Sequence, residues 1–395
     1  MNEIIPNKAE NDLIFQVNEA RDSKTPLRIE GGGTKQAIGR PIQSARAIFT
    51  TALNAITLYE PSEMVISALA GTPLRVIEAT LNEKNQMLPF EPADYRTLLG
   101  VDGEQTIGGI AAGNISGSRR ISVGACRDSL IGIRLLNGRG EIIKSGGRVM
   151  KNVTGLDLAK LTCGSWGTLG ILTEATFKVL PKPETAATLV LYGLDDARAV
   201  EAMSLAITSP FDITGAAHMP QGVERVAATL LRLEGFHASV DYRIRQLKIL
   251  LQKFGPAELM DDTTSSALWR KIRNVEALAE PREDAVWRIS IAPSKSVDFL
   301  NRLAMVLTFR HVFDWGGGLI HLQCAAQDDA GALAIRNELR GTGGHATLLR
   351  ASPDLRAAID VFEPQHPAIR KLSDDVRAAF DPARIFNPGL MSAGA

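Results

Sequence analysis

The chain has 395 residues, of which 45% are hydrophobic, 22% charged and 5% aromatic. Its 44 Lys and Arg residues balance its 44 Asp and Glu residues, which excludes the long-range basic field that selects for nucleic acid or an anionic membrane. A chain of this length is expected to form more than one domain. The 35 glycines exceed the usual share, so we expect loops to be unusually important in this protein.

The cysteines Cys126, Cys163 and Cys324 are far apart and lack CxxC spacing. They therefore indicate neither a disulfide framework nor an iron–sulfur or zinc site. The first residues, MNEIIPNKAENDLIF, contain acids and a proline where a signal peptide needs a cationic start and an apolar run. No segment approaches the roughly 20 apolar residues of a membrane span, so we expect a cytoplasmic protein without direct membrane insertion.

The first half of the chain shows alternating strand and helix patterns. A helix is expected around residues 11–23, and strands are expected at 27–30, 47–51 and 56–59, with two helices over 61–85 that separate at Gly71 and Thr72. Asn137–Gly138 predicts a hairpin with a type I′ turn, and Gly167–Pro181 suggests a second hairpin. A loop and a short helix are expected between these hairpins.

The pattern changes at PKPETAAT, residues 181–188, and we place a domain boundary there. Strands and helices then alternate in a repeated order, with strands in TLVLYG, ATLLRLEG, WRISIAP and GLIHLQCAA and helices at 195–208, 240–254, 295–307 and 328–340. This order predicts an antiparallel sheet with helices on one face.

The stretch RIEGGGTKQAIG, residues 28–39, follows a predicted strand but matches neither the dinucleotide motif GxGxxG nor the phosphate loop GxxxxGK[ST]. Bare backbone at Gly31, Gly32 and Gly33 would let successive N–H groups converge on an anion, helped by Thr34 and Lys35. The expected ligand is a phosphate or pyrophosphate. A tight turn that binds nothing is the alternative.

A second glycine-rich segment, residues 104–132, is composed largely of small residues, so its backbone could approach an extended ligand. We do not expect it to form a core helix. Its candidate ligand-contacting or loop-holding residues are Thr106, Gly108, Gly109, Asn114, Ser116, Gly117, Gly124 and Asp128. The alternative explanation is that these small residues are needed only for close packing of the chain.

The third segment is GSWGTLGILTE, residues 164–174, in which the backbone at Gly170 and Ile171 could meet the edge of a planar heterocycle. Two loops that could bind an anion, and a strand whose backbone could contact the edge of a heterocycle, together predict a dinucleotide held in an extended pose.

Taken in order, RIEGGGTK, TIGGIAAGNISG with RRISVG, the hairpin around NGRG, and GTLGILTE resemble the FAD-binding domain of the vanillyl-alcohol oxidase/p-cresol methylhydroxylase superfamily. KNVTGLDL, GGHATLLRA and FDPARIFNPGLM look most like the FAD-binding subunits of bacterial glycolate oxidase. The resemblance implies an α+β fold. Residues 1–182 would form an FAD-binding domain of two α/β subdomains, 183–345 an antiparallel-sheet cap domain, and 346–395 a C-terminal segment that returns to the flavin.

The resemblance also implies site residues. Gly31–Lys35 would hold the pyrophosphate of FAD, Thr106–Gly117 would run along the pyrophosphate and ribityl part, and Gly170–Ile171 would lie near the adenine. Asn387, in the Asn-Pro-Gly of the C-terminal segment, would lie near the isoalloxazine ring, whereas a simple turn is the alternative there. Many relatives bind FAD through a His near the first loop, but all six His follow position 217, so we expect non-covalent FAD, with Cys126 or Cys163 as the alternative link.

Oxidation of a 2-hydroxy acid at a flavin needs a base for the hydroxyl proton and a cation for the carboxylate. The related catalytic enzymes carry an H-x-G-D-G-N-x-H segment and a metal, whereas HVFDWGGGLIHLQ keeps the glycines and His321 but loses the Asp-Gly-Asn core. No metal site is therefore expected. His321 is a candidate base or a structural histidine, and Arg350 is a candidate carboxylate or flavin contact or a solvated cation.

The resemblance implies a subunit of a glycolate oxidase complex that supports oxidation of glycolate or D-lactate to the 2-oxo acid. A second FAD-linked catalytic subunit and an iron–sulfur subunit are the implied partners, and any membrane association would come through them. The alternatives are a stand-alone FAD-dependent oxidase of a 2-hydroxy acid or polyol, and a non-catalytic flavin-binding scaffold or electron-transfer subunit.

Overall fold

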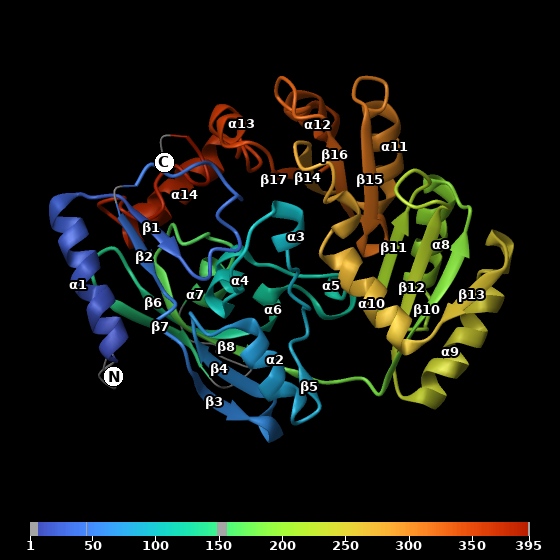
Figure 1. Ribbon diagram of the computed structural model, residues 1–395, viewed down its shortest axis with the longest axis horizontal. Helices are drawn as coiled ribbons and strands as arrows, with labels where there is room; N and C mark the ends of the chain where they lie inside the picture. The colour runs from blue at the N-terminus through green and yellow to red at the C-terminus, as the bar shows by residue number, and fades with distance from the viewer. Residues whose placement is uncertain (1–6, 45, 148–155, 394–395) are drawn as a thin grey trace.

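Two antiparallel sheets organise the chain, a five-stranded sheet in its first half and an eight-stranded sheet in its second half (Figure 1). The computed structural model describes residues 7–44, 46–147 and 156–393. The two sheets lie in separate halves of the molecule, and the C-terminal helices return to the N-terminal half (Figure 1).

The N-terminal half contains the five-stranded sheet, in the order β3-β4-β8-β6-β7, and a separate parallel pair, β1-β2. Its elements are α1 (Lys8–Ser23), β1 (Leu27–Glu30), β2 (Arg46–Phe49), β3 (Ile56–Glu60), η1 (Pro61–Glu63), β4 (Val65–Leu69), α2 (Leu74–Asn82), β5 (Gln86–Met87), α3 (Arg96–Leu99), α4 (Ile107–Gly113), α5 (Arg120–Val123), α6 (Cys126–Ser129), β6 (Leu130–Leu136), β7 (Ile142–Gly146), α7 (Leu158–Thr162), β8 (Ile171–Lys178) and β9 (Leu180–Pro181).

Helix α1 shows how the sequence builds this half. Asn7 and Glu10 form a capping box at its start, which satisfies backbone N–H groups that a helix end leaves free. The Glu10 carboxylate then accepts hydrogen bonds from Arg134 at 2.7 Å and from Thr173 at 2.6 Å, which tie α1 to strands β6 and β8. Leu13 and Val17, four residues apart, are buried on the same side of the helix.

Several local predictions for this half were wrong. Residues 65–69 form the strand β4, not a helix, because their backbone pairs with β3 on one side and β8 on the other, and residues 65–68 are buried. Gly167–Pro181 is not a hairpin, because β8 is one strand paired with β4 and β6 while β9 pairs with β5. The hairpin of β6 and β7 is confirmed, but Gly140 rather than Gly138 carries the positive φ, so the turn is not type I′.

The segment at residues 104–132 also differs from expectation, because residues 107–113 form the helix α4. Ile107, Gly108, Ile110 and Ala111 are buried, and a Cβ at Gly108 would lie 2.6 Å from the Cβ of Ala70. The small residues therefore let the helix pack closely on the chain beside β4. The short helix predicted after the first hairpin is α7, whereas the predicted loop at residues 151–155 lies outside the described residues.

The second half is an α+β layer built on an antiparallel sheet, as predicted, and its strand order is β13-β10-β12-β11-β15-β16-β14-β17. The strands β11, β13, β15 and β17 were not among the predicted ones. Its elements are β10 (Thr185–Tyr192), α8 (Asp196–Ile207), β11 (Gly215–Met219), β12 (Ala228–Gly235), α9 (His237–Leu250), η2 (Gln252–Phe254), β13 (Ala257–Met260), α10 (Asp262–Arg273), η3 (Glu276–Leu278), β14 (Ala285–Ser290), α11 (Pro293–Leu303), β15 (Phe309–Asp314), η4 (Trp315–Gly317), β16 (Leu319–Cys324), α12 (Ala332–Leu339) and β17 (His345–Arg350).

The two faces of this sheet serve different cores. One face packs with α8, α9, α11 and α12 in a core of its own. Apolar side chains of the other face, among them Val190, Leu230 and Val286, belong to the same core as the N-terminal sheet. The second half is therefore fused to the N-terminal half through continuous apolar packing, with α10 between them.

The C-terminal segment contains α13 (Pro353–Ala358) and α14 (Pro367–Phe380) and then returns to strand β1. The N–H of Leu27 donates to the carbonyl of Ile385 at 2.7 Å, and the N–H of Asn387 donates to the carbonyl of Leu27 at 2.9 Å. Ile385 and Phe386 are buried in the core that α1 and β1 share. The predicted return of the tail is confirmed, and β17 extends the eight-stranded sheet to Arg350.

Candidate functional site

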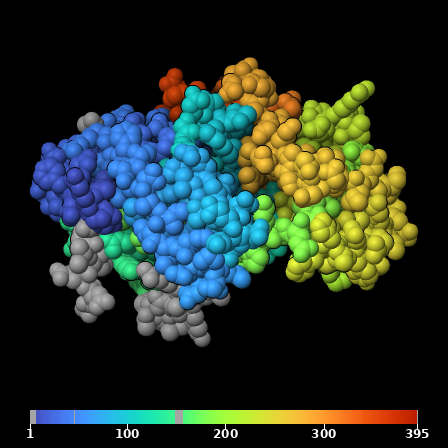
Figure 2. Space-filling view, turned by 60° about the horizontal axis from the view of Figure 1, so that its bottom comes forward, coloured from blue at the N-terminus to red at the C-terminus, as the bar shows by residue number. Residues whose placement is uncertain are grey.

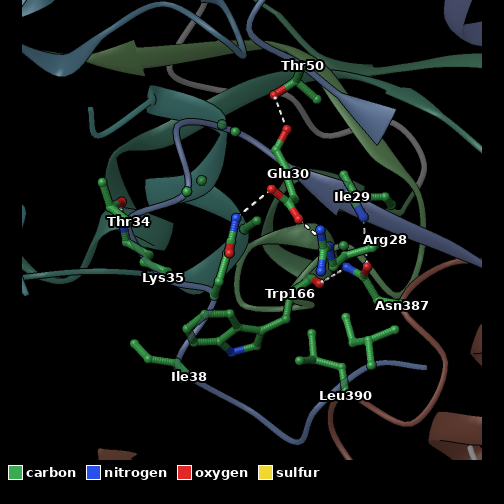
Figure 3. A pocket seen from close by; sticks show the side chains of 18 of the residues that line it. Arg28, Ile29, Glu30, Thr34, Lys35, Ile38, Thr50, Trp166, Asn387 and Leu390 are labelled. Carbon is green, nitrogen blue, oxygen red and sulfur yellow. Dashed lines mark hydrogen bonds and ion pairs between the residues drawn. The ribbon is translucent and has the colours of Figure 1, made fainter. Parts of the chain in front are cut away.

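A cavity of about 320 Å³ lies where the β1 strand, the glycine loop, the start of α4, the turn before β8 and the C-terminal tail meet. Figure 3 shows these segments around the opening, with Trp166, Asn387 and Leu390 lying on the tail side. The volume is within the roughly 300–1,000 Å³ of small-molecule sites. Ten predicted residues line the cavity: Gly31, Gly32, Gly33, Thr34, Lys35, Thr106, Gly108, Gly109, Gly170 and Asn387.

The glycine loop offers a row of unused hydrogen-bond donors. None of the residues that the structure describes accepts a hydrogen bond from the backbone N–H groups of Gly31, Gly32, Gly33, Thr34 or Lys35. Backbone donors without protein partners are rare unless water or a ligand completes them. Five successive donors at a cavity therefore suit the oxygens of a pyrophosphate.

The glycines are required by a neighbouring loop as well as by a ligand. A Cβ at Gly32 would lie 1.7 Å from the carbonyl oxygen of Glu104, and one at Gly31 would lie 2.3 Å from Oγ1 of Thr106. A side chain at position 32 would thus meet protein backbone, not the phosphate position that the sequence suggested. The two glycine-rich segments lie side by side, as expected, because their backbones can touch.

The cavity is electropositive. Four cationic residues, Arg28, Lys35, Arg40 and Arg356, and a single carboxylate, Glu30, line it. Glu30 is already engaged by Arg28 and Gln36. Burial lowers the pKa of Lys35 to about 8, and its Nζ contacts only neutral oxygens, of Gln105 at 3.0 Å and Thr34 at 3.2 Å. A bound anion would therefore restore the charge balance around Lys35.

Asn387 closes the tail side of the cavity. Its Oδ1 accepts a hydrogen bond from the N–H of Ile29 at 2.9 Å, and its Nδ2 donates to the carbonyl of Trp166 at 2.8 Å (Figure 3). The tail is thus fastened to both walls of the cavity. Trp166, Arg28, Arg40, Arg356 and Leu390 are lining residues that the sequence analysis missed. Arg28, Trp166 and Leu390 lie within stretches that the sequence singled out, whereas Arg40 and Arg356 had no local signal.

The other predicted members of the second segment do not line this cavity. Asn114 and Ser116 accept hydrogen bonds from the N–H groups of Arg127 and Cys126 at 3.0 and 2.9 Å. Asp128 accepts from the N–H of Ala125 at 2.8 Å, the loop-holding role that the sequence suggested. Gly117, Gly124 and Ile171 also lie away from the cavity, and Ile171 is buried in the core with α1.

Residues 117–119 instead join the FAD-binding half to the cap sheet. The carbonyl of Gly117 accepts a hydrogen bond from Nε1 of Trp315 at 3.1 Å, and Ser118 donates to Asp314 at 2.6 Å. Arg119 pairs with Glu234. In these contacts, the polar groups at the junction between the two halves are already hydrogen-bonded or ion-paired.

A second charge pair reinforces the same junction. Arg232 on β12 donates two hydrogen bonds to the carboxylate of Glu91, at 3.0 and 2.8 Å, and both residues are largely shielded from solvent. Burial alone would raise the pKa of Glu91, but the charges of Arg232 and Arg119 lower it to about 2. Glu91 therefore remains ionised and is unsuited to act as a base near neutral pH.

The candidate catalytic residues lie outside the cavity. His321 is buried on β16, its Nε2 has no hydrogen-bond partner among the described residues, and burial together with the Arg288 charge lowers its pKa to about 3. Arg350 donates to the backbone carbonyls of Leu98, Ala279, Pro281 and Asp284. The structure gives Arg350 a fastening role between the two halves.

No cluster of three His, Cys, Asp or Glu side chains suitable for a metal ion occurs in the described part of the chain. Cys126 and Cys163 are buried and do not line the cavity, and burial raises the pKa of the Cys126 thiol. Within the described ranges, no helix is both long and apolar enough to cross a membrane.

Comparison with known proteins agrees with this site. Residues 4–146 match the family described as FAD binding domain. A solved structure of alkyldihydroxyacetonephosphate synthase superposes with a TM-score of 0.69 at 16% identity, covering 96% of this chain and 74% of that one. The fold and cavity define a flavoprotein with an FAD-binding domain of the p-cresol methylhydroxylase type, and its cofactor is FAD.

Proteins of similar sequence identify the family within this class of flavoproteins. The chain is 33% identical to the glycolate oxidase subunit GlcE of Escherichia coli (strain K12), over 96% of this chain and 97% of that protein. It is 27% identical to the glycolate oxidase subunit GlcD of Bacillus subtilis (strain 168), over 94% of this chain and 85% of that one. A D-lactate dehydrogenase of Anaerostipes hadrus matches 44% of the chain at 30% identity. The chain belongs to the GlcE family of FAD-linked oxidoreductases.

Proposed function

We propose that this chain is the FAD-binding subunit of a glycolate oxidase complex, in which it supports oxidation of glycolate or D-lactate to the 2-oxo acid. Its named relatives are a glycolate oxidase subunit that it matches along nearly its full length and a D-lactate dehydrogenase that it matches in part. When bound, FAD supplies the capacity to accept two electrons from a substrate or from another redox group.

One observation supports a chain that binds FAD but leaves substrate oxidation to another subunit. Among the described residues, the cavity offers five free backbone donors and several cations for an anionic dinucleotide, but no histidine lines it and its carboxylate, Glu30, is ion-paired. Lys35, with a pKa of about 8, is mostly protonated at neutral pH and is assigned to the diphosphate. Removal of the hydroxyl proton of a 2-hydroxy acid needs a base within hydrogen-bond reach and with a pKa near the working pH. His321, with a pKa of about 3 and a position outside the cavity, meets neither condition.

We therefore assign the substrate chemistry to a second FAD-linked subunit and onward electron transfer to an iron–sulfur subunit. This chain would hold its FAD through Gly31–Lys35 and Asn387 and exchange electrons with those partners. The absence of histidine from the cavity lining and the burial of Cys126 and Cys163 support dissociable FAD.

The test compares the purified chain with the complex recovered from native lysate. We expect the chain alone to be yellow, to release FAD on acid precipitation and to bleach slowly when mixed anaerobically with glycolate or D-lactate in a stopped-flow instrument. The complex should bleach rapidly. Bleaching of the single chain at the rate of the complex would instead support a stand-alone oxidase, and a colourless chain unable to take up FAD would overturn the proposal.

A further inference from the structure

A second cavity, of about 410 Å³, lies where the FAD-binding half meets helix α10 of the cap. Glu78 and Asn82 of α2, Arg273 at the end of α10 and Lys182 of the connecting segment supply its polar lining. Figure 2 shows this face, where α2 in blue and the green connection between the two halves lie side by side. None of these residues belongs to the flavin cavity.

Arg273 is a cation without a directly bonded partner among the described residues, although its charge favours the ionised forms of Glu78 and Glu91 from beyond ion-pair distance. It makes no hydrogen bond or ion pair with any residue that the structure describes, and its Nε is buried. By contrast, Glu91, which lines the same cavity, is fully engaged by Arg232. A guanidinium left unpaired in a cavity is a strong site for a carboxylate, because the resulting hydrogen bonds are charge-assisted and bidentate.

Glu78 is the complementary free acceptor. Its carboxylate lies on the exposed side of α2 and makes no hydrogen bond or ion pair with a described residue, and the charges of Arg273 and Arg270 favour its ionised form. Lys182 donates from Nζ to Oδ1 of Asn82 at 3.1 Å, which leaves the amide nitrogen of Asn82 as a further free donor. The cavity thus presents donors beside one unused acceptor.

We propose that this cavity binds a small carboxylate that also carries a hydroxyl or ammonium donor. The carboxylate would pair with Arg273, the donor group would bond to Glu78, and the short carbon skeleton would lie against Met87 and Leu88. Its volume lies within the roughly 300–1,000 Å³ of small-molecule sites. Because the lining comes from both halves of the chain, a bound molecule would also stabilise their junction.

The test is isothermal titration calorimetry on the FAD-loaded full chain, with glycolate, glycine and acetate as probes. Glycolate and glycine carry the hydroxyl and ammonium donor, respectively, whereas acetate carries neither. We expect at least one of the first two to bind at a single site, and acetate to bind about tenfold more weakly because it cannot bond to Glu78. Binding of acetate as tightly as both, or binding of no probe at tens of millimolar, would overturn the proposal.

Variants separate this cavity from the flavin site. Arg273→Met should weaken binding about tenfold or more, whereas Lys271→Met, an exposed cation on the same helix, should not change it. Glu78→Gln should remove the preference for glycolate or glycine over acetate. Unchanged affinity in Arg273→Met, with the flavin absorbance spectrum and thermal unfolding preserved, would contradict the assignment.

Discussion

The side chain of Asn387 accepts a hydrogen bond from the backbone N–H of Ile29, which lies 358 positions earlier in the chain. The same side chain donates to the carbonyl of Trp166. One amide therefore joins β1, the turn before β8 and the C-terminal tail at the edge of the flavin cavity. Its backbone has a φ of 41°, a conformation that Asn adopts more readily than most residues.

We expect Asn387→Gly to lose most bound FAD and to lower the free energy of unfolding by about 1–3 kcal/mol, because both hydrogen bonds disappear while the backbone conformation remains allowed. The ratio of flavin to protein absorbance and urea unfolding measure the two effects. Asn387→Asp, which keeps the acceptor for Ile29 but not the donor to Trp166, should be intermediate. Full FAD retention in Asn387→Gly would show that the tail does not close the site.

Gly32 and Gly33 are adjacent but should respond differently to alanine. A Cβ at Gly32 would lie 1.7 Å from the Glu104 carbonyl oxygen, whereas one at Gly33 would meet only Nε2 of Gln36 at 3.4 Å. Gly32→Ala should cost about 3 kcal/mol or more and release FAD. Gly33→Ala, whose φ is +77°, should cost only about 1–2 kcal/mol. Equal unfolding midpoints in urea would refute the close packing of the two loops.

FAD affinity should depend on the protonation of Lys35. Burial holds the pKa of this amine at about 8 without a ligand, and a bound pyrophosphate would raise it. Affinity should therefore be highest below pH 8 and fall as the pH rises above 8. Fluorescence titration of the apoprotein between pH 6.5 and 9.5 measures this, and Lys35→Met should bind more weakly with a flat profile. A sloping profile in the variant would assign the titration elsewhere.

We expect Glu91 and Arg232 to contribute to the free energy of unfolding as a pair, so that removing one partner costs more than replacing both. Glu91→Gln should lower the free energy of unfolding by about 3–5 kcal/mol, because it removes the charge that accepts two short hydrogen bonds from the buried Arg232 and leaves that guanidinium with its longer contact to Glu234 at 3.4 Å. The double variant Glu91→Leu with Arg232→Met should lose less than Glu91→Gln. Because the folded pKa of Glu91 is about 2, below its usual 4.5, its contribution is present above pH 4.5 and is lost as the pH falls toward 2. Urea unfolding at pH 7 and pH 3 measures both effects.

His321 should affect acid stability but not electron transfer. Its folded pKa of about 3 lies below its usual 6.5, so its neutral form stabilises the fold above pH 6.5 and that contribution is lost as the pH falls from 6.5 to 3. His321→Leu should flatten the dependence of unfolding midpoint on pH between 7 and 4.5, whereas the exposed His237→Leu should not. A collapse of substrate-driven flavin reduction in the complex carrying His321→Leu would restore His321 as the base.

Features that depend on neighbouring residues could be predicted from the amino-acid sequence. The glycine run at residues 31–33 predicts a turn with bare backbone, the pattern over residues 11–23 predicts most of α1, and the repeated strand and helix order after residue 185 predicts an antiparallel cap sheet. These signals are local, because turn and cap chemistry act within a few residues and burial imposes a fixed period on helices and strands.

The contacts between polar groups that are far apart in the sequence could not be predicted and depend on the folded arrangement. Residues 117–119 resemble the rest of the glycine-rich segment in sequence, yet they bond to the cap through Trp315, Asp314 and Glu234. Arg350 donates to four carbonyl groups from two other segments, whereas Arg273 makes no hydrogen bond or ion pair with any residue that the structure describes. Hydrogen bonding and desolvation depend on which groups the fold brings within about 3 Å, and spacing along the chain does not encode that.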